Sequence, residues 1–424
     1  MSLLGKGIEA RRGRRVVASH AIARASFLAA GAFAALAVGW AVWVVWRGDS
    51  WWGPLHTFLA GTVLLAIAGA TQMFTITWSA APAPPAVLAR TQRWTLVAGV
   101  ALVLVGMASG TKWVIVAGAV LAIVGLGLLA LSLWSAVRNS LLRRFDLSAR
   151  FYMLALAAGV TGISLGGIMG AEVAGQSFLD IRLVHSHLNL VGLVGFTIVG
   201  TLPTILPTFA HHKAVSGVEA KVSWWLAVLA VVLIGSGLFV GGTGVGAGTA
   251  VAGVALFLIL VGVLLRLGRR GLEGGLPYLQ VAVGSTWLGA WAVIEGIGLI
   301  SGWTPGHFSE WTAAVVIAGV GQVLLGSLAY LLPVLAGPAP RLGRNFARTH
   351  SRPWLPLGLA NLGAGALLAG FPVVAFVAIA AWVADFGIRL ATLEWRSGNK
   401  GGGEQHDNDR DETTGDADGP GSPG

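Results

Sequence analysis

Apolar stretches of 18 or more residues recur throughout this 424-residue chain, separated by short connectors that carry most of its arginine and lysine. A hydrocarbon core of about 30 Å requires about 20 residues of helix, because each backbone amide in lipid must bond within its own segment. Buried strands of soluble proteins are also apolar but are much shorter. With 55% hydrophobic and 11% charged residues, the chain is therefore predicted to be an all-α integral membrane protein.

The apolar runs predict about twelve transmembrane helices joined by short connectors. We expect them at about 19–46, 55–79, 94–109, 113–137, 149–170, 183–208, 221–241, 246–267, 277–301, 308–335, 353–370 and 372–393. Together they form one transmembrane domain, 19–393. A basic N-terminus, 1–18, precedes this domain, and a polar tail, 397–424, predicted to be disordered, follows it.

The distribution of charge predicts the orientation of these helices. With the N-terminus inside, only Arg47, Lys112 and Arg182 lie on the outer side, and 25 of the 28 lysines and arginines lie inside. Cytoplasmic loops carry such an excess, so we expect a multi-pass protein of a prokaryotic plasma membrane with both termini in the cytoplasm. The net charge of +10 is scattered over the connectors, which favours the lipid bilayer as partner and argues against nucleic acid.

The chain contains no cysteine, which limits the cofactors that it can hold. Disulfides, iron–sulfur clusters, thiolate metal sites and covalently attached c-type haem are excluded. A metal ion or haem must be held by histidine, carboxylate or methionine. The sequence also lacks the phosphate-binding loop, the HExxH zinc motif and the G-x-S-x-G nucleophile motif of soluble enzymes, and it identifies no catalytic residue.

Four of the nine histidines are predicted near the outer membrane face: His56, His185, His187 and His307. His185 and His187 lie about 200° apart on a regular helix, so they face different neighbours, and His185 shares its face with Asn189. Two interpretations remain open. The histidines are interfacial groups with local hydrogen bonds, or they are axial ligands of haem or copper held between helices.

Polar side chains within the predicted helices give further candidates. Glu295 lies about 9 Å below the outer face, where an ionisable group is costly and a proton, cation or cofactor is the default partner. Asp385 and Arg389 are spaced for a direct ion pair. Gln322 and Asn361 are amides near mid-membrane, where such groups bind substrate or, more commonly, join helices.

Three segments resemble membrane proteins related to haem-copper oxidase subunit I, including the NnrS family and the membrane portions of some bacterial copper-oxidase-like proteins. The most specific is 185–204, HSHLNLVGLVGFTIVGTLPT, which is similar to an H-x-H-L-N-L-x-G pattern of those proteins. The others are 55–61, LHTFLAG, and 321–333, GQVLLGSLAYLLP. The resemblance implies a twelve-helix subunit I-like bundle with haem b or copper held by histidines of the second and sixth helices.

This chain also departs from that family. A true oxidase requires histidines in the seventh and tenth helices, and the corresponding ranges here contain none. The leading hypothesis is therefore a non-oxidase relative in which His56, with His185 or His187, binds haem or copper for a redox, metal-handling or nitric-oxide-linked role. The alternatives are a proton-coupled secondary transporter that uses Glu295, and a membrane scaffold for a separate redox or copper-protein partner.

Overall fold

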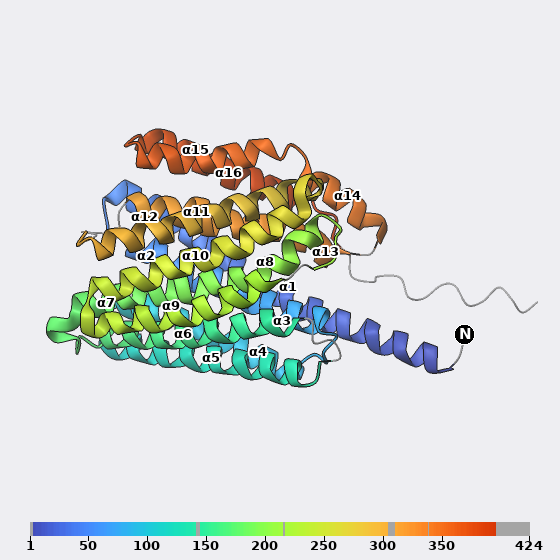
Figure 1. The fold of residues 1–424 in the computed structure, drawn as a ribbon, viewed down its shortest axis with the longest axis horizontal. Coiled ribbons are helices and arrows are strands. Elements are labelled where there is room, and N and C mark those ends of the chain that lie inside the picture. The colour runs from blue at the N-terminus through green and yellow to red at the C-terminus, as the bar shows by residue number, and fades with distance from the viewer. Residues whose placement is uncertain (1–2, 141–144, 215–216, 304–309, 338, 396–424) are drawn as a thin grey trace, which may run out of the picture.

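The computed structural model describes residues 3–140, 145–214, 217–303, 310–337 and 339–395, and every regular element within these ranges is a helix (Figure 1). The first half comprises α1 (Leu3–Arg47), α2 (Trp52–His56), η1 (Thr57–Val63), α3 (Leu64–Trp78), α4 (Ala86–Ser109), α5 (Lys112–Arg138), α6 (Asp146–Gly170), η3 (Gly175–Ser177), α7 (Phe178–His187), η4 (Leu188–Gly195) and α8 (Phe196–Phe209). The second half comprises α9 (Val218–Val240), α10 (Gly242–Leu267), η5 (Gly268–Gly274), α11 (Gly275–Ile300), α12 (Glu310–Val315), η6 (Val316–Gly321), α13 (Gln322–Ala336), α14 (Ala339–His350), α15 (Trp354–Leu368) and α16 (Pro372–Ala391).

In the described part of the chain, ten helical segments are long and apolar enough to cross a membrane. One of them, Gly242–Ile300, contains both α10 and α11 with the short η5 between them. The 15-residue α15 is apolar but shorter than the other candidates. The predicted all-α fold with multiple membrane-length helices is confirmed.

Several helices begin earlier than the apolar pattern predicts. α1 begins at Leu3 instead of 19, α4 at Ala86 instead of 94, and the helix containing α7 at Gly175 instead of 183. Hydropathy marks the part of a helix that suits lipid, whereas alanine, arginine and glutamine extend a helix into polar surroundings. Pro85 precedes α4 with an extended backbone (φ −52°, ψ 138°) and fixes where that helix starts. The predicted tail, 397–424, lies outside the described residues.

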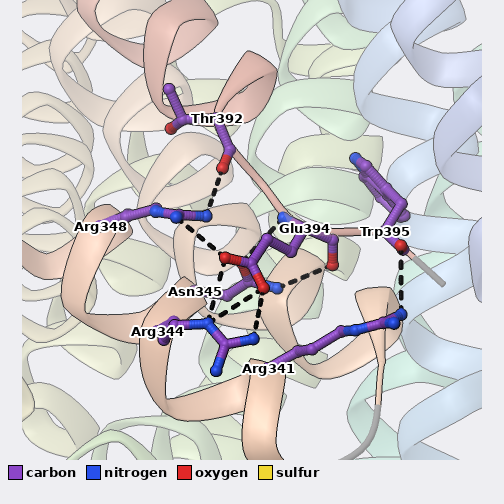
Figure 2. Close-up of polar contacts among 7 residues, drawn as sticks. All are labelled: Arg341, Arg344, Asn345, Arg348, Thr392, Glu394 and Trp395. Carbon is purple, nitrogen blue, oxygen red and sulfur yellow. Dashed lines mark hydrogen bonds and ion pairs between the residues drawn. The ribbon is translucent and has the colours of Figure 1, made fainter.

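α14 is a basic helix that the sequence pattern did not predict, and it joins α13 to α15 at the end of the bundle opposite α7 (Figure 1). Figure 2 shows how α14 holds the chain that leaves α16. The Glu394 carboxylate pairs with Arg344 at 2.6 Å and with Arg348 at 2.9 Å. The Asn345 side chain donates to the Glu394 carbonyl and accepts from its amide, at 3.2 and 2.9 Å. These contacts fix the chain after α16 against α14.

The predicted pairing of Asp385 with Arg389 is confirmed, with Nε of Arg389 2.6 Å from the carboxylate. The same guanidinium donates to the carbonyls of Arg348, Thr349 and Ser351 at the end of α14. A cation at this point satisfies carbonyls that have no partner within their own helix. The pair therefore joins α16 to the end of α14.

Three helices lie deepest in the bundle, and each contains a π-helical segment. In the helices Trp52–Trp78 and Gly175–Phe209, 83% and 89% of the most apolar stretch is buried, compared with 56% in Glu310–Ala336 and at most 44% in the other candidate spans. The π segments η1, η4 and η6 interrupt these three helices in turn. π-helical turns are rare in proteins, and many of those that occur lie at functional sites. These three helices also contain the three segments, 55–61, 185–204 and 321–333, that resemble relatives of haem-copper oxidase subunit I.

Glycine allows α10 and α11 to pack with their backbones in contact. A Cβ added at Gly246 would lie 2.6 Å from the Gly296 carbonyl oxygen, and one added at Gly296 would lie 2.5 Å from the Gly246 oxygen. Lipid tails are as apolar as the helices, so close packing of small residues is a main source of association. The contact holds α11 in the position from which it reaches α7.

Candidate functional site

His56 ends α2, where the helix changes to the π segment η1. Its ring stacks on Trp52, one turn earlier, with a centroid separation of 4.1 Å. Its Nδ1 lies 3.0 Å from the Trp52 carbonyl oxygen. A carbonyl only accepts, so Nδ1 carries the proton and Nε2 keeps a free lone pair. This is the tautomer required of a ligand that binds a metal through Nε2.

His185 is held in the same tautomer by a contact with a neighbouring helix. Its Nδ1 donates to the carbonyl of Gly162 in α6 at 2.7 Å, and the Asn189 side chain donates to the His185 carbonyl at 2.8 Å. Two glycines of α6 make room for these groups, because a Cβ at Gly166 would lie 2.8 Å from the His185 ring and one at Gly162 would lie 2.5 Å from the Asn189 amide. α6 therefore sets the orientation of the His185 ring.

The structure brings His56 and His185 together from segments 129 positions apart (185 − 56). Their ring centroids lie 6.5 Å apart and their planes differ by 12°. Neither Nε2 atom has a hydrogen-bond partner among the described residues. A metal–nitrogen bond of about 2 Å and a ring radius of about 1.2 Å place the centroids of two opposed imidazole ligands about 6.4 Å apart. The two rings are stacked, and their centroid separation is close to that of two imidazoles bound to one metal ion.

No group of three or more histidine and carboxylate side chains converges on one point in the described ranges. The histidine pair alone does not complete the four-coordinate shell of a structural zinc ion. Haem brings its own four equatorial nitrogens and needs only axial ligands from the protein. Imidazole also suits copper. By donor type alone, a pair of histidines would suit haem or copper.

His187 faces a different part of the bundle from His185, as the helical spacing predicts. Its Nδ1 donates to the Leu183 carbonyl at 2.9 Å, and its ring lies 5.9 Å from that of Trp291 in α11, with 17° between the planes. The side chain is buried, and its Nε2 has no partner in the described structure. His187 therefore lies apart from the His56–His185 pair and belongs to a second polar cluster.

Glu295 lies on α11 one turn beyond Trp291 and is also buried (3% exposed). Its Oε2 and the Trp291 Nε1 have no hydrogen-bond partners among the described residues. A Cβ added at Gly242 would lie within about 4 Å of both Leu183 and Leu299, which places these two side chains at one depth. His187 and Glu295 lie four residues deeper on their respective helices, and therefore also at similar depth.

The remaining predicted residues have separate roles or positions. Gln322 and Asn361 form a network with Trp287: Trp287 donates to Asn361 at 2.7 Å, and Asn361 donates to Gln322 at 3.3 Å. These bonds join α11, α13 and α15. Of the two roles predicted for these amides, substrate binding and helix association, the observed contacts are those of helix association. His307 lies outside the described residues.

Sequence reasoning did not identify the groups that orient the histidines. Trp52 could have been found from its spacing, because residues four apart on a helix are neighbours. Gly162, Gly166 and Trp291 come from distant helices, and no local pattern points to them. The π segments also had no clear signal beyond the glycines that each contains.

The fold and the site define a class of protein: a helical bundle with many apolar, membrane-length helices and a half-buried pair of histidines. Comparison with models of protein families found no match, and comparison with curated proteins found no relative. The arguments for function below accordingly depend on the chain's own residues.

Proposed function

We propose that this chain is a membrane protein that holds haem, or alternatively copper, between His56 and His185 for a redox, metal-handling or nitric-oxide-linked role. The observation that carries the proposal is the paired geometry: two imidazoles 6.5 Å apart with planes 12° from parallel. In both histidines, Nδ1 donates its hydrogen bond to a backbone carbonyl. A bound haem or copper ion would supply one-electron chemistry.

The protein's contribution is to orient the ligands. The Gly162 carbonyl on His185 and the Trp52 carbonyl on His56 fix each ring and increase the basicity of its Nε2. Trp52 covers one face of the His56 ring.

The resemblance to haem-copper oxidase subunit I gives a second line of support. The family-like segments lie in Trp52–Trp78, Gly175–Phe209 and Glu310–Ala336, which are the three most buried helices and the three with π segments. We propose the same twelve-helix, subunit I-like bundle, with α10 and α11 as separate spans and α15 as the shortest. The missing histidines of the seventh and tenth helices argue against reduction of oxygen by the standard binuclear centre.

The cofactor content of purified variants tests this proposal. We expect haem absorbance or bound copper in protein from haem- and copper-replete cells, with loss of most of it in His56→Ala and in His185→Ala. His187→Ala is the matched control, since it removes a buried imidazole from the same helix but outside the pair. A folded wild-type protein without haem or copper would overturn the proposal, as would equal loss in all three variants.

The orientation is also proposed: both termini in the cytoplasm and the histidine pair near the outer face of a prokaryotic plasma membrane. The basic residues predicted on the inner side, 25 of the 28, support it. The absence of native cysteine makes labelling direct. An impermeant maleimide should label Ser50→Cys in intact cells and Ser351→Cys only after permeabilisation, whereas the reverse pattern would contradict the orientation.

A second candidate function is proton-coupled transport through Glu295. The buried carboxylate and the His187 imidazole each have an unpartnered atom in the described structure, and they lie at similar depth on facing helices. In proteoliposomes loaded with pyranine, proton movement on addition of substrate should disappear in Glu295→Gln. It should persist in Glu172→Gln, whose exposed carboxylate pairs with Lys112. Unchanged proton movement in Glu295→Gln would exclude this candidate.

A further inference from the structure

A cavity of about 440 Å³ lies at the ends of α8 and α10, opposite the end of the bundle where α7 carries His185 (Figure 1). It opens between the end of α8 and the end of α10. Its lining is His211, His212, Lys213, Arg266, Leu267 and Arg270. Three of these six residues are lysine or arginine and two are histidine, so basic side chains dominate the lining.

The chain is shaped locally to present three of these residues. α8 ends with the His211 amide bonded to the Thr208 carbonyl and the His212 amide bonded to the Pro207 carbonyl. His211 has a positive φ of 58°, the left-handed conformation that ends a helix with this pair of bonds. The sharp turn directs 211–213 across the end of α10. The helix cap therefore fixes the backbone of His211 and His212, and the side chains of Lys213 and Arg270 are exposed at the surface.

Pairing of charges leaves the cavity positive. Arg266 forms a two-pronged ion pair with Glu219 of α9, with the second bond at 2.9 Å. Lys213 and Arg270 have no ion-pair partner among the described residues. Glu273 is the nearest other acid in sequence, and its side chain is exposed. At least two cationic groups thus remain available to a ligand.

The surface beside the cavity is suited to lipid chains. Leu265 and Val261 of α10 are 78% and 47% exposed, and Trp225 and Val222 of α9 are 70% and 44% exposed. Exposed apolar side chains on membrane-length helices face acyl chains, and tryptophan is enriched where the chains meet the headgroups. A ligand in the cavity would contact basic side chains in the cavity itself and the exposed apolar side chains of α9 and α10 beside it.

We propose that this cavity binds the phosphate headgroup of an anionic phospholipid, with its acyl chains lying along α9 and α10. Lys213 and Arg270 contact the phosphate, and the Glu219–Arg266 pair holds the two helices at the spacing the headgroup needs. Basic pockets between helices on the cytoplasmic side are a recognised form of lipid site. The site is independent of the histidine pair and goes beyond the proposed function, but it rests on the proposed orientation, which places this end of the helices in the cytoplasm.

Native mass spectrometry of the purified full chain with added phosphatidylglycerol or phosphatidylcholine tests the site. We expect wild type to prefer phosphatidylglycerol, and Lys213→Gln/Arg270→Gln to lose affinity for it by about 25-fold, at roughly fivefold for each charge. Arg90→Gln/Arg138→Gln is the matched control, because it removes two basic residues elsewhere at the same end and should keep the preference.

Three results would overturn the proposal. The first is equal binding of both lipids by wild type, and the second is equal loss in the two double variants when both keep the wild-type melting temperature. The third is displacement of phosphatidylglycerol by millimolar inorganic phosphate, which would show recognition of a free anion without the acyl chains.

Discussion

One additional methyl group at Gly296 is expected to destabilise the bundle. In Gly296→Ala the new Cβ would lie 2.5 Å from the Ala250 nitrogen and 2.5 Å from the Gly246 oxygen. Both are backbone atoms, so the strain can be relieved only by moving α10 away from α11. Overpacking of this kind costs about 1–3 kcal/mol, and the better helix propensity of alanine offsets about 1 kcal/mol of it. The net expectation is a loss of stability of up to about 2 kcal/mol.

Gly235→Ala provides the matched control, since a Cβ there would have no atom within 4 Å. That variant should keep the wild-type stability or gain up to about 1 kcal/mol from helix propensity. Thermal unfolding in detergent, followed by the fluorescence of the 18 tryptophans, measures both. A melting temperature for Gly296→Ala equal to or above that of Gly235→Ala would refute the close packing of α10 on α11.

Further predictions concern the polar contacts. Asn361→Ala removes the acceptor of Trp287 and should lower stability by about 1–3 kcal/mol, while Asn139→Ala, whose amide bonds only within its own helix, should have little effect on the same melting curves. Burial, with smaller contributions from His211 and Arg389, lowers the pKa of His350 to about 4. Unfolding raises that pKa towards 6.5, so the unfolded state binds the extra proton and stability should fall, by up to about 3 kcal/mol, as pH drops from about 6.5 to about 4. His350→Asn should flatten that part of the pH profile, and an unchanged profile would contradict the assignment. Arg344, through its hydrogen bond, lowers the pKa of Glu394 to about 2, so its contacts should persist above about pH 4.5 and be lost only as pH falls towards 2. Glu394→Gln should accelerate proteolysis just after α16 with little change in the melting temperature, and wild-type cleavage rates would show that α14 does not hold this segment.

The sequence was sufficient for the helical class and for most helix positions because long apolar runs have few alternatives in lipid. It did not predict α14, since a basic amphipathic helix has the composition of a connector. The early start of α1 was missed for a related reason. Hydropathy identifies only the part of a helix that prefers lipid, and α1 also includes the polar residues that precede that part.

The candidate site was predictable only in part. The positions of His56 and His185 on two apolar helices suggested that they could meet. The separation of His187 from them followed from helical geometry. The supporting contacts depend on tertiary packing: the α6 carbonyl on His185, the glycines that admit its ring, and Trp291 beside His187. Residues of α6 and α11 are distant in sequence from the groups they touch, so no local pattern encodes those contacts.

X-ray absorption at the iron and copper edges of the purified protein tests the central claim most directly, because it reports the ligands of a bound metal. The account predicts a bound metal with scattering from two imidazoles in wild type and in His187→Ala, and loss of metal or of one imidazole in His185→Ala. A folded wild-type protein without iron or copper, or with a metal whose imidazole scattering is unaffected by His185→Ala, would contradict it.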